Sequence, residues 1–403
     1  MKLKFTELNS GYKGEKRVSR FSPKTRSKAI ITGALLVAFV FVYILSSVGV
    51  IPLGALVTRA KTSVSGDRER FPITINTEST LSTDIIGDSI ILLTTENVAV
   101  YSEKGKMVYS QPHVYAKPGI SVNGDKAVVF DRGGKGFMLL TDKKTVYEGT
   151  AENTIITAEY GKNGNYALGT RAKTATSALT VYNKNNKAVF QWNCAYEHIV
   201  SIALSDNGKY AGAAVMGAEN GEIFTTVQYF GFDYKEPLNT QKITGSSPFD
   251  LEFTSYNTLT LLTDNGVYTV NRKAEKYEET LKYYSTEFNS CDVLEKGNYV
   301  VSLAKYGSEN VFEILLFKPK GDIKTTISAD FEIKNVRMSD KYIFALTEKR
   351  IVVYNFSGNI VSEIDFKGDA HSLLPTDDFV FIVSLDKITR CFSYGDSSVE
   401  LST

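Results

Sequence analysis

The sequence predicts an all-β protein, a closed β-propeller of eight four-stranded blades, preceded by one transmembrane α-helix. From Phe71 onward, short apolar and aromatic runs alternate with turns rich in Gly, Asn and Asp. These runs recur about every 40 residues, which is the period of a four-stranded propeller blade. Between Lys28 and Arg59 the chain carries no charged side chain. This apolar stretch exceeds the roughly 20 residues that cross the core of a bilayer.

Each repeat begins with a tight turn that leads into an apolar strand. The turns start at Gly87, Gly124, Gly164, Gly208, Tyr256, Gly297, Asp340 and Asp377. A further apolar strand follows, and it often ends in an aromatic residue and a polar turn, as at 98–105, 179–186 and 351–358. Asn, Asp and Gly tolerate the positive φ that tight hairpins require. The copy at Tyr256 is the weakest, so seven blades are the alternative count.

The two ends of the repeat region predict that the ring closes. The last repeat offers strands near 372–374, 379–384 and 388–392, and a fourth strand is missing. The segment 71–77 (FPITINT) alternates between apolar and polar residues before the first repeat. We expect it to form the outer strand of the last blade, because closure removes the exposed sheet edges of an open array.

Four segments follow from these patterns: a basic cytoplasmic tail (1–28), a transmembrane helix (29–56), a linker (57–70) and an extracytoplasmic propeller (71–403). The tail holds nine Lys and Arg residues against two Glu residues. Since Lys and Arg are retained on the cytoplasmic side, the N-terminus is expected inside and the propeller outside. The apolar residues of 30–51 favour insertion by about 5 kcal/mol. We therefore expect a single-pass protein of the cell membrane, held in the lipid bilayer through 29–56.

Composition argues against several classes of function. The net charge of the chain is +1, and the positive excess lies in the tail. The outer part is therefore mildly acidic, which argues against a nucleic-acid partner. The histidines and cysteines show no spacing typical of a metal site, a redox motif or a catalytic triad. They are His113, His198, His371, Cys194, Cys291 and Cys391. No catalytic residue, metal ligand or cofactor site is predicted.

One aromatic stretch is a candidate binding surface. It lies at 228–235 and is joined by two tyrosines of the next repeat. If exposed, these side chains could dock a protein or stack on a sugar, because aromatic residues concentrate at interface hot spots. The alternative is that they pack between blades, where large side chains fill the space. The candidates are Tyr229, Phe230, Phe232, Tyr234, Tyr283 and Tyr284.

The turn at 205–210 (SDNGKY) resembles the Ser-x-Asp-Gly-Lys turn of bacterial propellers, including periplasmic translocation-associated and lactonase-like propellers. The whole layout resembles an uncharacterised family of single-pass, membrane-anchored propeller proteins of Gram-positive bacteria, with an architecture similar to tryptophan-aspartate-repeat and quinoprotein propellers. The Trp signatures of those better-known families are missing, since Trp192 is the only Trp. The resemblance implies a fold and a location but brings no catalytic residue.

These observations favour a binding platform in the cell envelope, with an envelope protein or a cell-wall glycan as partner. The alternative is an extracytoplasmic hydrolase or lactonase-like enzyme that uses carboxylates at the propeller channel. The candidate acids for that reading are Asp125, Asp206, Asp340 and Asp377, although turn chemistry alone explains Asp at these positions. A third alternative is a sensor that signals through the helix to a cytoplasmic partner.

Overall fold

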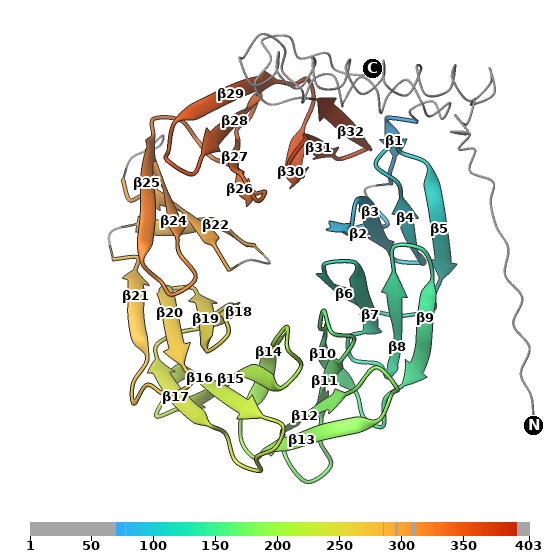
Figure 1. Cartoon of the computed structure of the whole chain (residues 1–403), viewed down its shortest axis with the longest axis vertical. Helices are drawn as coiled ribbons and strands as arrows, with labels where there is room; N and C mark the ends of the chain where they lie inside the picture. Colours follow the sequence, from blue (N-terminus) through green and yellow to red (C-terminus); the bar gives the residue numbers. More distant parts are fainter. Residues whose placement is uncertain (1–69, 77, 285, 295–296, 308–310, 393–403) are drawn as a thin grey trace, which may run out of the picture. The chain divides into compact units, whose positions relative to one another are not determined.

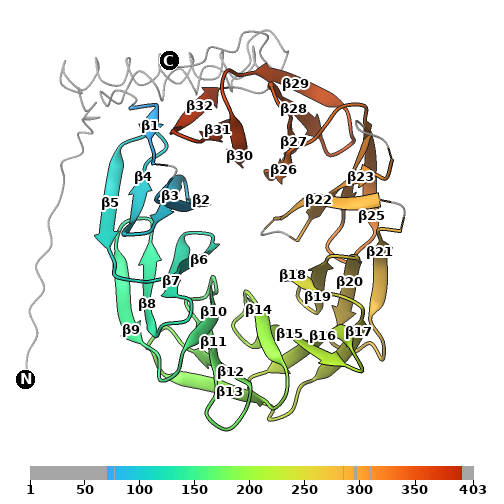
Figure 2. The same ribbon diagram turned by 180° about the vertical axis from the view of Figure 1, so that it is seen from behind.

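The computed structural model describes residues 70–392, apart from 77, 285, 295–296 and 308–310. Within these residues, eight four-stranded antiparallel sheets follow one another around a ring (Figures 1 and 2). The first strand of each sheet lies nearest the ring axis and the last strand lies outermost. The predicted all-β, eight-bladed propeller is confirmed. The weak copy at Tyr256 forms a regular blade, so the seven-bladed alternative is wrong.

The first half of the ring contains blades 1 to 4. Blade 1 is formed by β2 (Thr80–Ile86), β3 (Ser89–Thr94), β4 (Asn97–Tyr101) and β5 (Met107–Pro112). Blade 2 is formed by β6 (Pro118–Asn123), β7 (Lys126–Asp131), β8 (Gly136–Thr141) and β9 (Thr145–Thr150). Blade 3 is formed by β10 (Ile155–Tyr160), β11 (Tyr166–Arg171), β12 (Ser177–Tyr182) and β13 (Ala188–Cys194). Blade 4 is formed by β14 (His198–Leu204), β15 (Tyr210–Glu219), β16 (Glu222–Gly231) and β17 (Asn239–Thr244).

The second half contains blades 5 to 8. Blade 5 is formed by β18 (Pro248–Ser255), β19 (Thr258–Thr263), β20 (Gly266–Asn271) and β21 (Glu278–Lys282). Blade 6 is formed by β22 (Thr286–Val293), β23 (Tyr299–Lys305), β24 (Phe312–Phe317) and β25 (Ile323–Ala329). Blade 7 is formed by β26 (Asn335–Met338), β27 (Tyr342–Leu346), β28 (Arg350–Asn355) and β29 (Ile360–Asp365). Blade 8 is formed by β30 (Ala370–Pro375), β31 (Phe379–Ser384), β32 (Lys387–Phe392) and β1 (Ile73–Thr74).

Blade 8 joins the two ends of the ring, as predicted. Ile73 of β1 pairs with Ile388 of β32, and Thr74 pairs with Lys387. The backbone N–H of Ile75 then donates to the carbonyl oxygen of Asp386 at 2.9 Å. The expected closure by 71–77 is therefore confirmed, although the paired strand is only two residues long.

The strand order gives the ring two distinct ends. The turns between the first and second strands, and between the third and fourth strands, lie at one end of every blade. The turns between the second and third strands, and the connections from blade to blade, lie at the other end. At Arg70 the chain enters the ring at the first end, because the Arg70 N–H donates to the carbonyl oxygen of Lys104 in the β4–β5 turn. We call this end the entry face and the opposite end the distal face.

The blades adhere through the apolar faces of their middle strands. The strand β31 is buried along its whole length. Ile351 and Val353 of blade 7, for example, share one buried cluster with Val380 and Ile382 of blade 8. Because each middle strand packs on both sides, it reads as a continuous apolar run rather than an alternating one.

Threonine initiates several of the tight turns. The Oγ1 of Thr347 accepts a hydrogen bond from the N–H of Arg350 at 3.1 Å and donates to the Arg350 carbonyl at 2.9 Å. Thr94, Thr263 and Thr376 make the same pair of bonds three residues ahead. A hydroxyl in this position satisfies both backbone groups at the turn, which explains why Thr precedes so many hairpins.

The predicted tail, membrane helix and most of the predicted linker lie outside the described residues. Among the residues that are described, no helix is long and apolar enough to cross a membrane. The predicted span at 29–56 therefore stays a prediction.

Replacing Ile73 tests the closure. Ile73 is buried in a cluster with Phe381 and Ile388, so Ile73→Ala should lower the free energy of unfolding by about 2–5 kcal/mol. The exposed Val108→Ala on the outer strand of blade 1 is the matched control and should cost less than about 0.5 kcal/mol. Denaturant unfolding of the full chain measures both. Equal, small effects would show that β1 does not hold the ring closed.

Candidate functional site

Charged side chains occupy the innermost strands of five blades. Six of them are Asp84 on β2, Glu159 on β10, Asp250 and Glu252 on β18, Asp292 on β22 and Arg337 on β26. The innermost strands surround the ring axis, so these groups, which we call the axial cluster, approach one another from different blades (Figure 1). Arg337 and Asp292 influence the pKa of Asp84 although blade 8 separates their blades from blade 1. The cluster therefore faces a common centre.

Two contacts in the axial cluster connect neighbouring blades. Ser121 of blade 2 donates from its Oγ to Oε2 of Glu159 in blade 3 at 2.6 Å. In blade 7, Nη1 of Arg337 donates to Oδ1 of Asp292 in blade 6 at 3.2 Å, and the backbone N–H of Met338 donates to Oδ2 at 2.8 Å. Asp292 is thus the carboxylate whose negative charge is compensated directly by Arg337.

Burial in the ring shifts the carboxylates toward their protonated forms. It raises the pKa of Glu159 to about 8. The pKa of Asp84 rises to about 6 because the surrounding inner strands displace part of its hydration, although the residue itself is exposed. Burial also raises the pKa of Glu252, and the nearby carboxylates of Asp250 and Glu159 add to that rise. Burial raises the pKa of Asp292 even though Arg337 acts in the opposite direction. Removal from water therefore favours the protonated forms of these carboxyl groups.

The axial cluster was missed in the sequence, although a signal was present. Each of these acids sits within the strand that precedes a tight turn, as in Asp84 shortly before Gly87. A carboxylate inside an otherwise half-apolar inner strand has no explanation in turn chemistry. The arrangement can hold protons or attract a cationic group. Among the described residues, no group of three His, Cys, Asp or Glu side chains could hold a metal ion.

The acids considered from the sequence lie elsewhere, in the entry-face turns between first and second strands. Asp125 pairs with Lys126 at 2.6 Å, Asp206 with Lys162 at 3.7 Å and Asp377 with Lys341 at 3.1 Å. Asp340 lies in the corresponding turn of blade 7. Lys126 lowers the pKa of Asp125 through their hydrogen bond. Roles in turns and ion pairs account for these carboxylates. The carboxylates near the ring axis belong to the axial cluster instead.

The six aromatic candidates do not form one surface. Tyr229 and Phe230 are consecutive on β16 and both are buried, Tyr229 against blade 5 and Phe230 against blade 3. Phe232 is partly buried, and its ring lies 5.5 Å from that of Phe190 on blade 3. Tyr234 is exposed in the β16–β17 turn at the entry face. Tyr229 and Phe230 therefore do not belong to an exposed surface, because a third strand buries both of its faces between neighbouring blades.

The remaining two candidates belong to an aromatic ridge at the distal face. Tyr283 is buried and its ring lies 5.9 Å from that of Phe288, which in turn lies 5.0 Å from Phe249. Tyr284 is 86% exposed and Phe249 is 50% exposed. Tyr284 has a φ of +30°, which is unusual for a bulky side chain. We call Phe249, Tyr283, Tyr284 and Phe288 the distal ridge.

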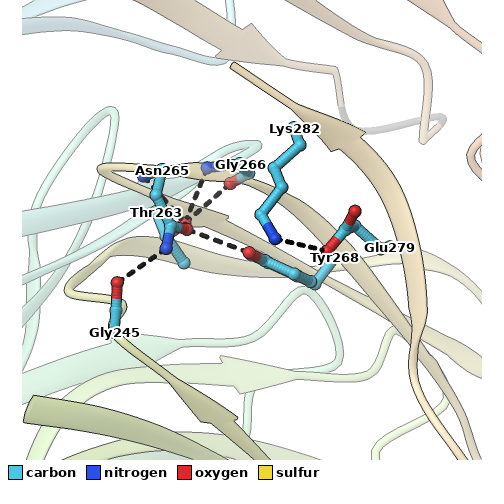
Figure 3. A network of polar contacts seen from close by, with 7 residues as sticks. All are labelled: Gly245, Thr263, Asn265, Gly266, Tyr268, Glu279 and Lys282. Carbon is cyan, nitrogen blue, oxygen red and sulfur yellow. Dashed lines mark hydrogen bonds and ion pairs between the residues drawn. The ribbon is translucent and has the colours of Figure 1, made fainter. Parts of the chain in front are cut away.

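A polar network holds the base of this ridge (Figure 3). Asn265, in the β19–β20 turn, donates from Nδ2 to the carbonyl oxygen of Gly245 at 2.6 Å and accepts from the Tyr268 hydroxyl at 3.0 Å. Its backbone carbonyl accepts from the N–H of Tyr283 at 3.2 Å. Asn265 therefore ties the connection that carries Tyr283 and Tyr284 to the connection between blades 4 and 5.

Further aromatic side chains extend from the same end of the ring. Tyr196 in the connection from blade 3 to blade 4 is 88% exposed, and Tyr306 in the β23–β24 turn is 80% exposed. Large exposed aromatic side chains concentrate at protein interaction sites. Together with the distal ridge they make the distal face of blades 3 to 6 rich in exposed rings.

A protein-family model matches residues 65–391, which is most of the chain. The chain belongs to DUF5711, a family of unknown function. No protein of curated function matches its sequence. The membership agrees with the expectation of an uncharacterised propeller family.

Solved structures share the fold of this DUF5711 protein. It is similar to a crystal structure of the eukaryotic initiation factor, with a TM-score of 0.57, 11% identity, and coverage of 85% of this chain and 92% of that chain. BamB from Moraxella catarrhalis gives a TM-score of 0.50 at 12% identity, over 80% and 98% of the two chains. Apo AztD from Citrobacter koseri gives 0.50 at 12% identity, over 72% and 87%. At these identities the likeness establishes the propeller fold.

The axial cluster predicts how stability depends on pH. A carboxyl group whose pKa is higher in the folded state than in the unfolded state binds more protons when folded, so stability falls as pH rises between the two values. For Glu159 this window runs from its ordinary value of 4.5 to about 8. Glu159→Gln keeps an acceptor for Ser121 and should raise the melting temperature at pH 8 more than at pH 5.

Thermal unfolding at both pH values measures this difference. The control is Glu96→Gln, which changes an exposed glutamate at the distal face and should shift neither melting temperature by more than a degree or so. An equal effect of Glu159→Gln at pH 5 and pH 8 would contradict the proton uptake assigned to Glu159.

Proposed function

We propose that this DUF5711 protein is a membrane-anchored, extracytoplasmic propeller that binds another envelope protein at its distal face, without catalysis of its own. The observation that carries the proposal is the distal ridge, with nearly fully exposed rings beside it on a rigid ring of sheets. The segment 29–56 would hold the chain in the membrane with the basic tail inside. Tethering would keep the propeller at a high local concentration near partners in the same membrane.

The geometry of the distal face supports a protein partner. Phe249 and Tyr284 expose large apolar areas that an interface would bury, while Asn265 and its network hold the backbone beneath them in place. Rigid aromatic side chains lose little conformational entropy on binding. Residues presented by loops on a rigid scaffold are the usual way in which propellers bind.

The proposal predicts crosslinking from one end of the ring. A photoreactive benzoylphenylalanine at Tyr284 or Phe249 of the full chain, produced in its own membrane, should give a discrete protein adduct. The control position is Tyr234, which is equally aromatic and exposed but lies at the entry face and should give no such adduct. Adducts that a glycan hydrolase removes and a protease does not would identify a cell-wall glycan instead. The absence of any adduct from the distal positions would refute the binding face.

The orientation of the chain gives a separate prediction. In intact cells a membrane-impermeant maleimide should modify Tyr196→Cys on the distal face, whereas Ser10→Cys in the tail should react only after lysis. Cys194 and Cys391 are buried, and burial raises the pKa of the Cys194 thiol to about 11 and that of Cys291 to about 12, so the native thiols should give little background. Modification of Ser10→Cys in intact cells would reverse the proposed topology.

A further inference from the structure

The outer strands of five blades share an irregularity near the entry face. In the described part of the chain, blades 1, 2, 3, 6 and 7 each have one extra residue there, without a partner position on the neighbouring strand. Such a bulge leaves the extra residue unpaired, bends the strand and increases its local twist. The extra residues are Val108, Val146, Val189, Lys324 and Val361.

Four of these five residues are valines, and all four are exposed. The first residue of the outer strand adds a further exposed apolar side chain in blades 1, 6 and 7. We call the seven apolar residues the aliphatic rim; between 36% and 53% of each is exposed. They are Met107, Val108, Val146, Val189, Ile323, Ile360 and Val361.

Lysines accompany the aliphatic rim. The turns that lead into the outer strands of blades 1 to 3, at 102–106, 142–144 and 183–187, hold six lysines against Glu103 and Asp142. The corresponding turn of blade 6 holds Lys318 and Lys320 against Asp322. Exposed aliphatic groups beside basic side chains are the composition of surfaces that lie on anionic membranes.

The aliphatic rim is not spread evenly around the ring. The blades that carry it flank blade 8, where the chain enters (Figure 1). Blade 4 lies opposite blade 8, and its outer strand begins with Asn239 and Thr240 after a turn that contains Asp233 and Glu236. Blade 5 begins its outer strand with two glutamates. The exposed aliphatic side chains are therefore centred on the point of entry. Basic side chains are spread more widely, since the entry-face turns of blades 4 and 5 also hold Lys235, Arg272, Lys273 and Lys276.

The chain outside the structure ends at the same place. Arg70 donates its N–H to the Lys104 carbonyl, within the lysine-containing turn of blade 1. Residues 57–69 are all that separates this point from the apolar segment 29–56. A chain that leaves a membrane at residue 57 would reach the propeller at the rim and not at the distal face.

We infer that the aliphatic rim and its lysines rest on an anionic lipid bilayer, with blade 8 nearest the membrane and blades 4 and 5 lifted away from it. This inference rests on the proposed membrane anchor. The valines would enter the interfacial region, which admits apolar side chains to a depth of about 5–10 Å. The lysines would lie at the headgroups, and the distal ridge would face away from the membrane toward its partner.

The test places a fluorophore on the rim of the full chain in liposomes. NBD is attached to Val146→Cys, and the matched control is Thr240→Cys, since both residues are second in an outer strand and exposed. With lipid-borne quencher and anionic lipid, Val146→Cys should lose roughly twice as much fluorescence as Thr240→Cys or more. The difference should shrink in zwitterionic liposomes, and in Lys143→Glu/Lys144→Glu, because lysine attraction to anionic lipid is then removed.

Flotation of the same samples separates the two levels of the proposal. If the protein floats with the liposomes and Val146→Cys is quenched no more than Thr240→Cys, the rim is not at the membrane, and the anchor stands. If the protein does not float, both the anchor and the rim contact are overturned. Quenching of Val146→Cys that is the same with anionic and zwitterionic lipid refutes the role of the lysines and, with it, the inferred contact.

Discussion

The pairing of β1 with β32 is the constraint on which the rest of the structure depends. Every other blade is built from one continuous stretch of chain, so this pairing, together with the apolar packing of blade 8 on blade 1, converts a row of sheets into a ring. Two paired residues are enough because Ile73 also enters the apolar cluster between blades 8 and 1. Closure leaves no open blade face and brings the innermost strands around one axis. The same contact decides where the preceding chain emerges, and so it gives an otherwise repetitive ring a defined entry face and a defined direction.

Closure also creates the unusual electrostatics of the axis. Side chains that would be solvated on an isolated sheet are surrounded by the first strands of eight blades. Among the described residues of the axial cluster, Asp292 alone accepts a hydrogen bond from a guanidinium group, and Glu159 accepts one from the hydroxyl of Ser121. A carboxyl group that is removed from water without a cationic partner lowers the stability of the folded state when it ionises. Apolar residues at these positions would avoid that cost. Perturbed carboxyl groups of this kind collect at functional sites more often than elsewhere, and ion-pair networks that are merely structural also produce them.

The fold was accessible from the sequence because its signals are local and repeated. Tight turns at regular spacing predicted the blades, and the alternation in FPITINT predicted the closing strand. The candidate site was less accessible. Tyr229 and Phe230 look like a dense aromatic patch in the sequence, yet they point to opposite sides of one strand and are buried in two different interfaces. Phe249 and Phe288, which complete the distal ridge with Tyr283 and Tyr284, lie in different blades, so only the ring brings them together. The axial carboxylates were not predicted because only one or two acids occur in each of four separate repeats.

The fold accounts for the bulges of the outer strands but does not determine which residue occupies each bulge. An outer strand that twists more strongly than its neighbour gains from an extra residue, and any side chain can occupy the extra position, as Lys324 does in blade 6. The fold therefore explains the bulge but not the valine. An exposed valine buries little apolar area, and its β-branched side chain suits an extended strand. Valine nonetheless occupies the position in four of the blades near the point of entry, while the opposite blade presents Thr240. Strand propensity would favour valine in any blade, so the restriction of these exposed valines to blades around the point of entry is what the inferred contact with lipid would explain.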